Sequence, residues 1–164
     1  MGEPKRIVEA RHGAPLYEED YAAWLEAQVA LMRADRWSEI DKDNLLDEVE
    51  SLGRSEFNAF VSAIRVVLMH MLKWDFQEDY RSRSWANSIT GHRHRIEKAL
   101  GDNPSYRARI DEASHEAYQR ALLEAADETR YPVRLFPQQL PYSWEEIMTR
   151  PHEVPGKPFD GWKP

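Results

Sequence analysis

Apolar side chains return every three or four positions between Ser55 and Phe76. This spacing places them on one face of an α-helix, and the face is wide enough to contact several neighbouring helices. A strand would need apolar residues at alternate positions, and no such pattern continues over a useful length of the chain. We therefore expect an all-α fold with this segment as its central helix. Its apolar face consists of Phe57, Phe60, Val61, Ile64, Val67, Leu68, Met71 and Trp74.

The same spacing predicts four further main helices, and hence a helical bundle of about five main helices with a packed interior. The second of the five would begin at Asp41–Asn44, bury a stripe of Leu45, Val49 and Leu52, and end at Gly53, because glycine is common just after the last turn of a helix. The other three are expected at about Tyr17–Ala34, Ser84–Leu100 and Ser105–Glu128.

The chain divides into three predicted regions. Residues 1–14 are polar and without periodicity, and they indicate an N-terminal tail. Residues 15–130 contain the helices of a single bundle domain. Residues 131–164 hold seven of the ten prolines, which have no amide hydrogen and disfavour helix in the preceding residue. We expect this last region to be an extension that packs on the bundle through aromatic side chains. It should carry one short helix at Ser143–Thr149, with Ser143 as its cap and Glu145 and Glu146 in its first turn.

Length and composition exclude several classes of protein. A chain of 164 residues with 41% hydrophobic residues is long enough to bury a hydrophobic core without covalent cross-links. The absence of cysteine excludes disulfides and thiolate metal sites, which is consistent with a reducing cytoplasm. No apolar run approaches the ~20 residues that span a bilayer. The N-terminus also lacks the apolar segment of a secretory signal. We expect a cytoplasmic protein that does not enter the membrane.

The charge distribution is uneven along the chain. A net charge of −7 disfavours general binding to nucleic acid or to anionic membranes. From Tyr17 to Leu52 there are 11 acidic and 3 basic residues, whereas from Arg54 to Arg109 there are 10 basic and 6 acidic ones. The acidic and basic regions either pack against each other or leave a cationic face open to an anionic partner, and the sequence favours the first alternative.

Three polar residues fall at the borders of apolar helix faces and form a candidate polar cluster. They are Glu48, His70 and His92. If three helices brought them together, they could bind one metal ion or act as a general acid and base. The alternative is that each histidine lies at the edge of the core with one hydrogen-bond partner, as burial of a polar group requires. No motif of a known catalytic class accompanies them, and the sequence indicates no cofactor and no established metal site.

Basic and aromatic residues also gather between positions 73 and 95. Lys73, Arg81, Arg83 and Arg95 are candidate anion-binding residues, because guanidinium groups bind phosphate or carboxylate in a bidentate manner. Trp74 and Trp85 could either stack on a ligand or anchor the core. In the second case the cations would pair with the acidic residues of the chain itself.

Several segments in order resemble one family of proteins. These are LYEEDYAAW, DNLLDEVESLGRSE, LMHMLKWDF, RSRSW and LPYSWEE. Together they are similar to the bacterial domain-of-unknown-function family twenty-nine, and the resemblance extends from about Leu16 to Ile147. It implies a compact, all-helical cytosolic protein and carries no established activity, cofactor or catalytic residue. Pro141-Tyr142 departs from the proline-tryptophan pair that is frequent in this family.

Three functions remain open at this point. The first is a non-enzymatic binding or accessory protein that contacts another macromolecule, with another protein as the expected partner. The second is binding of a phosphate-bearing ligand or nucleic acid through the residues between positions 73 and 95, although the net charge does not favour nucleic acid. The third is a metal-dependent enzyme that uses the candidate polar cluster. The sequence indicates no oligomeric state.

Overall fold

The computed structural model describes residues 14–154, which divide into two compact units between Arg54 and Ser55, an N-terminal unit of residues 14–54 and a C-terminal unit of residues 55–154. The predicted tail at 1–14 therefore lies outside the described residues except for its last position. Residues 155–164 of the predicted extension lie outside them as well. The boundary between the units falls within one helix, Lys42–Phe76.

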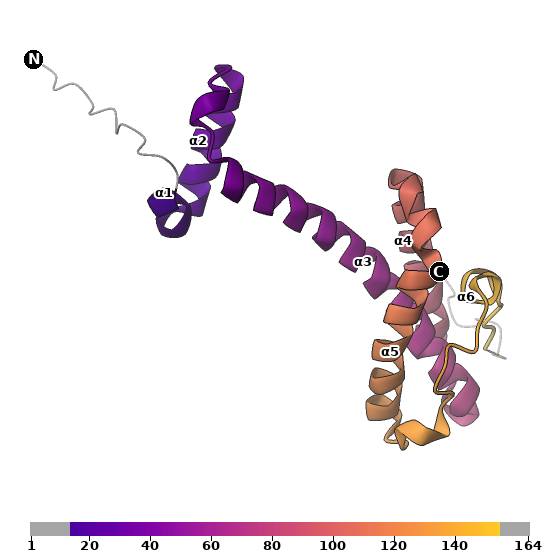
Figure 1. Cartoon of the computed structure of the whole chain (residues 1–164). Coiled ribbons are helices and arrows are strands. Elements are labelled where there is room, and N and C mark those ends of the chain that lie inside the picture. Colours follow the sequence, from indigo (N-terminus) through magenta and orange to yellow (C-terminus); the bar gives the residue numbers. More distant parts are fainter. Residues whose placement is uncertain (1–13, 155–164) are drawn as a thin grey trace, which may run out of the picture. The chain divides into compact units, whose positions relative to one another are not determined.

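The described residues are helical and contain no strand, which confirms the all-α prediction. There are four main helices between residues 14 and 154, α2 (Tyr21–Arg33), α3 (Lys42–Phe76), α4 (Arg83–Asp102) and α5 (Ile110–Thr129). The short helices α1 (Ala14–Glu19) and α6 (Trp144–Thr149) lie near the two ends of the described chain (Figure 1). Short 3₁₀ helices occupy 37–39, 78–80, 104–109 and 133–135. No helix within residues 14–154 has the length and apolar character needed to cross a bilayer.

The predicted number of five main helices is wrong because two of them are one. The helix that was expected to end at Gly53 continues through it into the central helix, and both belong to α3. A glycine ends a helix readily when it adopts a left-handed conformation, but Gly53 stays helical and has open space around it. A glycine inside a helix costs only about 1 kcal/mol relative to alanine, which the long flanking segments can offset.

Three helix starts also differ from the sequence prediction. The helix expected at about Tyr17–Ala34 is divided at Asp20, whose side chain caps α2 by accepting a hydrogen bond from the amide of Ala23. Ser82 rather than Ser84 caps α4, since its side chain accepts a hydrogen bond from the amide of Trp85. The α5 helix begins at Ile110 rather than at Ser105, because residues 104–109 form a 3₁₀ helix. This tighter segment directs the ring of Tyr106 into the core.

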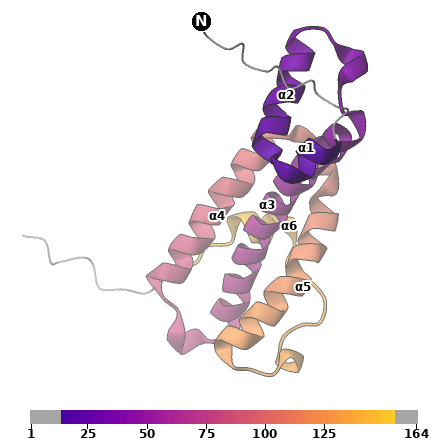
Figure 2. The same ribbon diagram turned by 90° about the vertical axis from the view of Figure 1, so that its left-hand side faces the viewer.

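The C-terminal unit contains a continuous hydrophobic core. The second half of α3 lies beside α4 and α5, as both views of the ribbon show (Figures 1 and 2). Most of the predicted apolar face of the central helix is buried, including Met71, and α5 contributes alanines that permit a close approach. Ion pairs of Arg65 with Glu124 and of Lys73 with Glu128 connect α3 to α5.

Residues 131–154 form the C-terminal strap, which packs on the core of this unit. Phe136, Tyr142 and Ile147 of the strap belong to the buried core, as the aromatic content of this region predicts. Ser143 and Glu146 form a capping box at the start of α6, which confirms the predicted short helix and its cap. The Tyr118 hydroxyl donates a hydrogen bond to the carbonyl of Pro137 at 2.6 Å, so α5 also holds the strap.

The N-terminal unit contains α1, α2 and the first part of α3 (Figure 1). Trp24 and Gln28 of α2 are its buried residues within the described range. The Trp24 indole donates a hydrogen bond to the Asp41 carboxylate at 3.1 Å. The side-chain carbonyl of Gln28 accepts a hydrogen bond from the backbone amide of Asp41 at 2.9 Å. These polar contacts connect α2 to the start of α3 in a unit that buries few apolar side chains.

Candidate functional site

The N-terminal unit exposes large apolar side chains that form the N-terminal apolar surface. Trp37 is 58% exposed, and on α3 Leu46 is 59%, Val49 58% and Leu52 66% exposed. The prediction that Val49 and Leu52 lie in a core stripe is therefore wrong, whereas Leu45 is half-buried. Scattered apolar residues are ordinary on a protein surface. A contiguous row of them on one helix face, in contrast, is typical of an interaction site.

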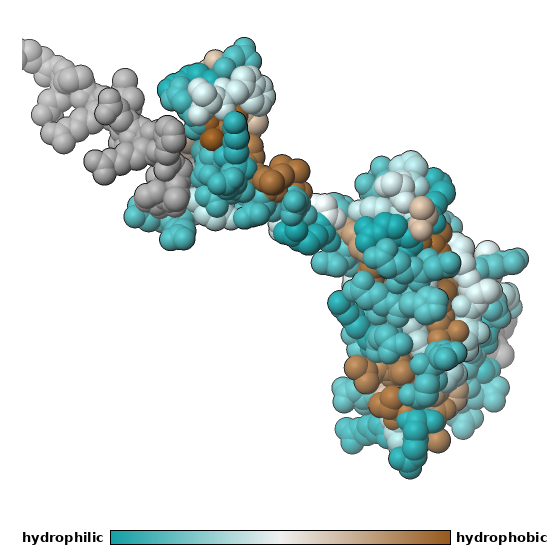
Figure 3. Space-filling view, in the orientation of Figure 1, coloured by the Kyte–Doolittle hydropathy of each residue, from teal (hydrophilic) through white to brown (hydrophobic). Residues whose placement is uncertain are grey.

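A groove of about 330 Å³ opens on this surface and is lined by Trp37, by Ile40 and by residues of the first turns of α3. Its lining is apolar except for Lys42, whose methylene groups can cover apolar neighbours while the amine stays in water. Figure 3 shows the exposed apolar side chains at the beginning of α3. A groove of this kind can accept apolar side chains from a partner.

Glu48 has a structural role inside the N-terminal unit. Its two carboxylate oxygens accept hydrogen bonds from the hydroxyls of Tyr17 at 2.6 Å and Tyr21 at 2.9 Å. These bonds lower the pKa of Glu48, and the Tyr17 bond contributes most. The same bond is the main reason that the pKa of Tyr17 is raised to about 12. Glu48 thus connects the first two helices to α3.

His70 lies in the C-terminal unit, where α3, α4 and α5 meet. Its ring stacks on Trp85, with the centroids 6.4 Å apart and the planes 13° apart. Lys73 lies 4.4 Å from the centroid of the same indole and pairs with Glu128. Burial, followed by the nearby charge of Lys73, lowers the pKa of His70 to about 4. His70 is therefore a neutral ring at the edge of the core, and its buried Nδ1 lacks a hydrogen-bond partner among the described residues.

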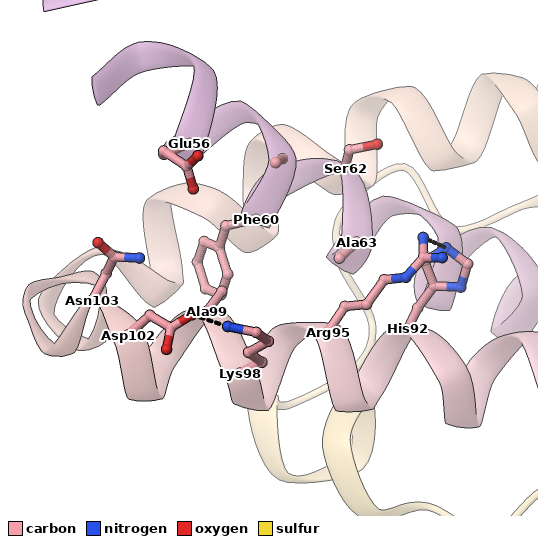
Figure 4. Close-up of a pocket in the computed structure, with 11 residues that line it drawn as sticks. Glu56, Phe60, Ser62, Ala63, His92, Arg95, Lys98, Ala99, Asp102 and Asn103 are labelled. Atoms are coloured by element: carbon pink, nitrogen blue, oxygen red, sulfur yellow. Dashed lines mark hydrogen bonds and ion pairs between the residues drawn. The ribbon is translucent and has the colours of Figure 1, made fainter. Parts of the chain in front are cut away.

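His92 and Arg95 line a separate groove of about 440 Å³ between α3 and α4 (Figure 4). Both nitrogens of the His92 ring have a neighbour. Its Nδ1 lies 2.9 Å from the Ser88 carbonyl oxygen, and its Nε2 lies 3.3 Å from the Arg95 guanidinium. Nδ1 therefore carries the proton and Nε2 accepts from arginine. Lys98 lies on the same groove but pairs with Asp102.

The other predicted cations have partners within the chain. Arg81 donates to the carbonyl of Trp74 at 2.8 Å and to the Glu78 carboxylate at 2.9 Å. Lys73 is buried and pairs with Glu128, and Arg83, the first residue of α4, also has an interaction partner. Of the two tryptophans, Trp74 is a core residue and Trp85 is half-buried. Most of this basic segment is thus occupied in holding the C-terminal unit together.

Asp75 at the end of α3 is a polar centre that the sequence interpretation did not identify. Its carboxylate accepts two hydrogen bonds from Arg150, at 2.9 and 2.5 Å, and one from the Tyr142 hydroxyl at 2.7 Å. Burial alone would raise the pKa of Asp75, but the bonds from Arg150 and Tyr142 outweigh it and lower the pKa. These partners are separated from Asp75 by many residues, so no local spacing could have indicated the contact.

The three residues of the candidate polar cluster are not grouped as a metal site. Glu48 belongs to the N-terminal unit, while His70 and His92 belong to the C-terminal one. Glu48 and His70 also lie in opposite halves of the same helix, α3, rather than on two facing helices. Within residues 14–154, no three His, Asp or Glu side chains lie close enough together to hold a metal ion.

The family of the chain follows from a comparison with family models. Residues 16–152 match the model of the domain of unknown function DUF29. Because the match covers most of the chain, the protein belongs to this family, which confirms the resemblance seen in the sequence. No curated protein and no solved structure matches the chain.

Proposed function

We propose that this member of the DUF29 family is a non-enzymatic binding or accessory protein that contacts another protein through its N-terminal apolar surface. The observation that carries the proposal is the solvent exposure of Leu46, Val49 and Leu52 at helical spacing on α3, next to the exposed Trp37. Each Å² of apolar surface left in water costs about 25 cal/mol, so covering this row would supply part of the free energy of association. Tryptophan is moreover enriched among the residues that dominate binding energy.

The size of the N-terminal unit supports the same interpretation. A segment this short rarely supplies a core that is stable by itself, and such small units often depend on a partner. Here the polar contacts of Trp24 and Asp41 position the helices, while apolar side chains of α3 stay outside. The C-terminal unit, in contrast, buries a full core and provides a stable support.

The other two functions have less support. Binding of phosphate through the basic segment would need free cations, yet Lys73 and Arg81 already pair with Glu128 and Glu78. The metal-dependent reaction would need Glu48 beside the histidines, and its two oxygens are already occupied by tyrosines. The cysteine-free sequence is consistent with the cytoplasm as the proposed location.

Site-specific crosslinking in cells tests the proposal. The photo-reactive amino acid p-benzoylphenylalanine is placed at Val49, and in a control at Ser51, which is also exposed and lies about 200° away around the helix. We expect one defined crosslinked protein from position 49 and none from position 51. The identified partner, once purified, should bind the full chain and lose binding when Leu46→Ser and Val49→Ser are combined. Equal crosslinking at both positions, or unchanged binding of the double variant, would contradict the proposal.

A further inference from the structure

We infer that the partner presents a cationic amphipathic helix to the N-terminal apolar surface. This inference rests on the proposed function and adds the chemistry of the partner. Three observations carry it: the helical spacing of the exposed row, a line of carboxylates beside it, and the net charge of the region between Tyr17 and Leu52 that bears both.

The exposed row has the geometry of a helix-docking face. Leu46, Val49 and Leu52 recur at a spacing of three, so they lie along one side of α3. Leu46 and Val49 of this row also line the groove, together with Trp37 and with other residues from the first turns of α3. An amphipathic helix places apolar side chains into such a groove at its own three- and four-residue spacing.

A line of acidic side chains borders this row. Asp43, Asp47 and Glu50 are separated by four and three positions, so they are neighbours on the surface of α3, and all are exposed. Asp43 lies three positions before Leu46 and Glu50 four positions after it, which places the carboxylates beside the apolar face. Glu50 pairs with Arg54 at 3.2 Å, whereas no ion pair of Asp43 or Asp47 is found within residues 14–154. Two carboxylates next to the apolar row are thus available for lysine or arginine of a partner.

The net charge of this region decides between a foreign partner and a second copy. From Tyr17 to Leu52 the 11 acidic residues exceed the 3 basic ones by eight. Two copies that met through this surface would bring two strongly negative regions together, and like charges across an interface oppose association. A cationic helix would instead gain attraction from the same field. The charge therefore favours a partner of the opposite sign over self-association.

Two synthetic peptides of equal length test the inference against the full chain. One carries leucines on one helical face and lysines on the other, and the second has glutamates in place of the lysines. Fluorescence anisotropy should detect binding of the lysine peptide only, and the binding should weaken as salt rises. Combining Leu46→Ser and Val49→Ser should abolish it. The double change Asp43→Asn and Asp47→Asn should weaken it by about tenfold, because it removes the carboxylates beside the groove.

The matched control removes the same charge from another place in the unit. Glu18→Gln with Glu19→Gln, at two exposed positions of α1, should leave the affinity within about twofold of that of the unchanged chain, because salt screens distant charges. Equal weakening by both acidic pairs, or equal binding of the glutamate peptide, would overturn the inference. So would a dimer seen by light scattering that the Leu46 and Val49 changes dissociate. In each of these cases a partner crosslinked at Val49 would still support the proposed function, so the two failures are distinguishable.

Discussion

At the scale of single residues, burial distinguishes two tryptophans that the sequence alone does not separate. Trp74 is 5% exposed and packs in the C-terminal unit, whereas Trp37 is 58% exposed on the N-terminal apolar surface. We expect Trp74→Ala to lower the free energy of unfolding by about 3–5 kcal/mol, because it removes a large buried side chain. Trp37→Ala should change it by less than about 0.5 kcal/mol. Urea unfolding of both variants measures the difference, and equal losses would contradict the assigned burial.

His70 predicts a pH dependence of stability. Its pKa is about 4 in the folded chain and about 6.5 in the unfolded chain, so the unfolded state binds more protons between these values. The contribution of His70 to stability is present above pH 6.5 and is lost as the pH falls toward 4. We expect His70→Gln to make the slope of unfolding free energy against pH smaller in this window. His94→Gln, at an exposed position of α4, is the control for the replacement of a histidine by glutamine. Identical slopes for all three proteins would contradict the burial of a neutral His70.

At the scale of elements, α3 is continuous where a break was expected. Gly53 is exposed, helical and free of neighbours around its missing Cβ. Gly53→Ala should therefore stabilise the helix by about 0.5–1 kcal/mol, since alanine loses less backbone entropy. Circular dichroism at 222 nm during heating measures the effect. Gly53→Pro should lower the helical signal, because proline removes a hydrogen bond and clashes with the preceding turn. A loss of stability with alanine would indicate that α3 ends at this glycine.

A charged contact between the C-terminal strap and the end of α3 should help to hold the strap in place. Arg150 follows α6 and binds the Asp75 carboxylate at the end of α3 with two hydrogen bonds. A double-mutant cycle of Asp75→Ala and Arg150→Ala should show a coupling energy of about 0.5–3 kcal/mol, as expected for directly contacting charges. Limited proteolysis should also cleave either single variant faster within residues 131–142. Coupling near zero would mean that the apolar contacts of Phe136 and Ile147 hold the strap without this pair.

At the scale of the whole molecule, the two units differ in the amount of buried apolar surface. The C-terminal unit contains the hydrophobic core, whereas Trp24 and Gln28 are the buried residues of the described N-terminal unit. Backbone amides of α2 should therefore exchange with deuterium sooner than those of α5, because local opening costs less where few apolar contacts are lost. Hydrogen exchange followed by mass spectrometry measures this difference. Slower exchange in α2 than in α5 would contradict the marginal stability of the N-terminal unit.

The sequence by itself determined the fold class, the central helix and the short capped helix of the strap. These features depend on local rules: apolar residues at a spacing of 3.6, and serine with glutamate three positions later at a helix start. Both rules act within a few residues, so they hold whatever the rest of the chain does. The burial of Ile64, Met71 and Trp74 follows from the same periodicity.

Only the tertiary structure decided which apolar faces are covered. Leu45, Val49 and Leu52 have the same spacing as the core residues of α3, but no described segment covers the outer side of the last two. The pairing of Asp75 with Arg150 and of Lys73 with Glu128 likewise depends on residues distant in sequence. Periodicity shows which side of a helix is apolar, and the packing of other segments then determines whether that side lies in the core or remains exposed for a partner.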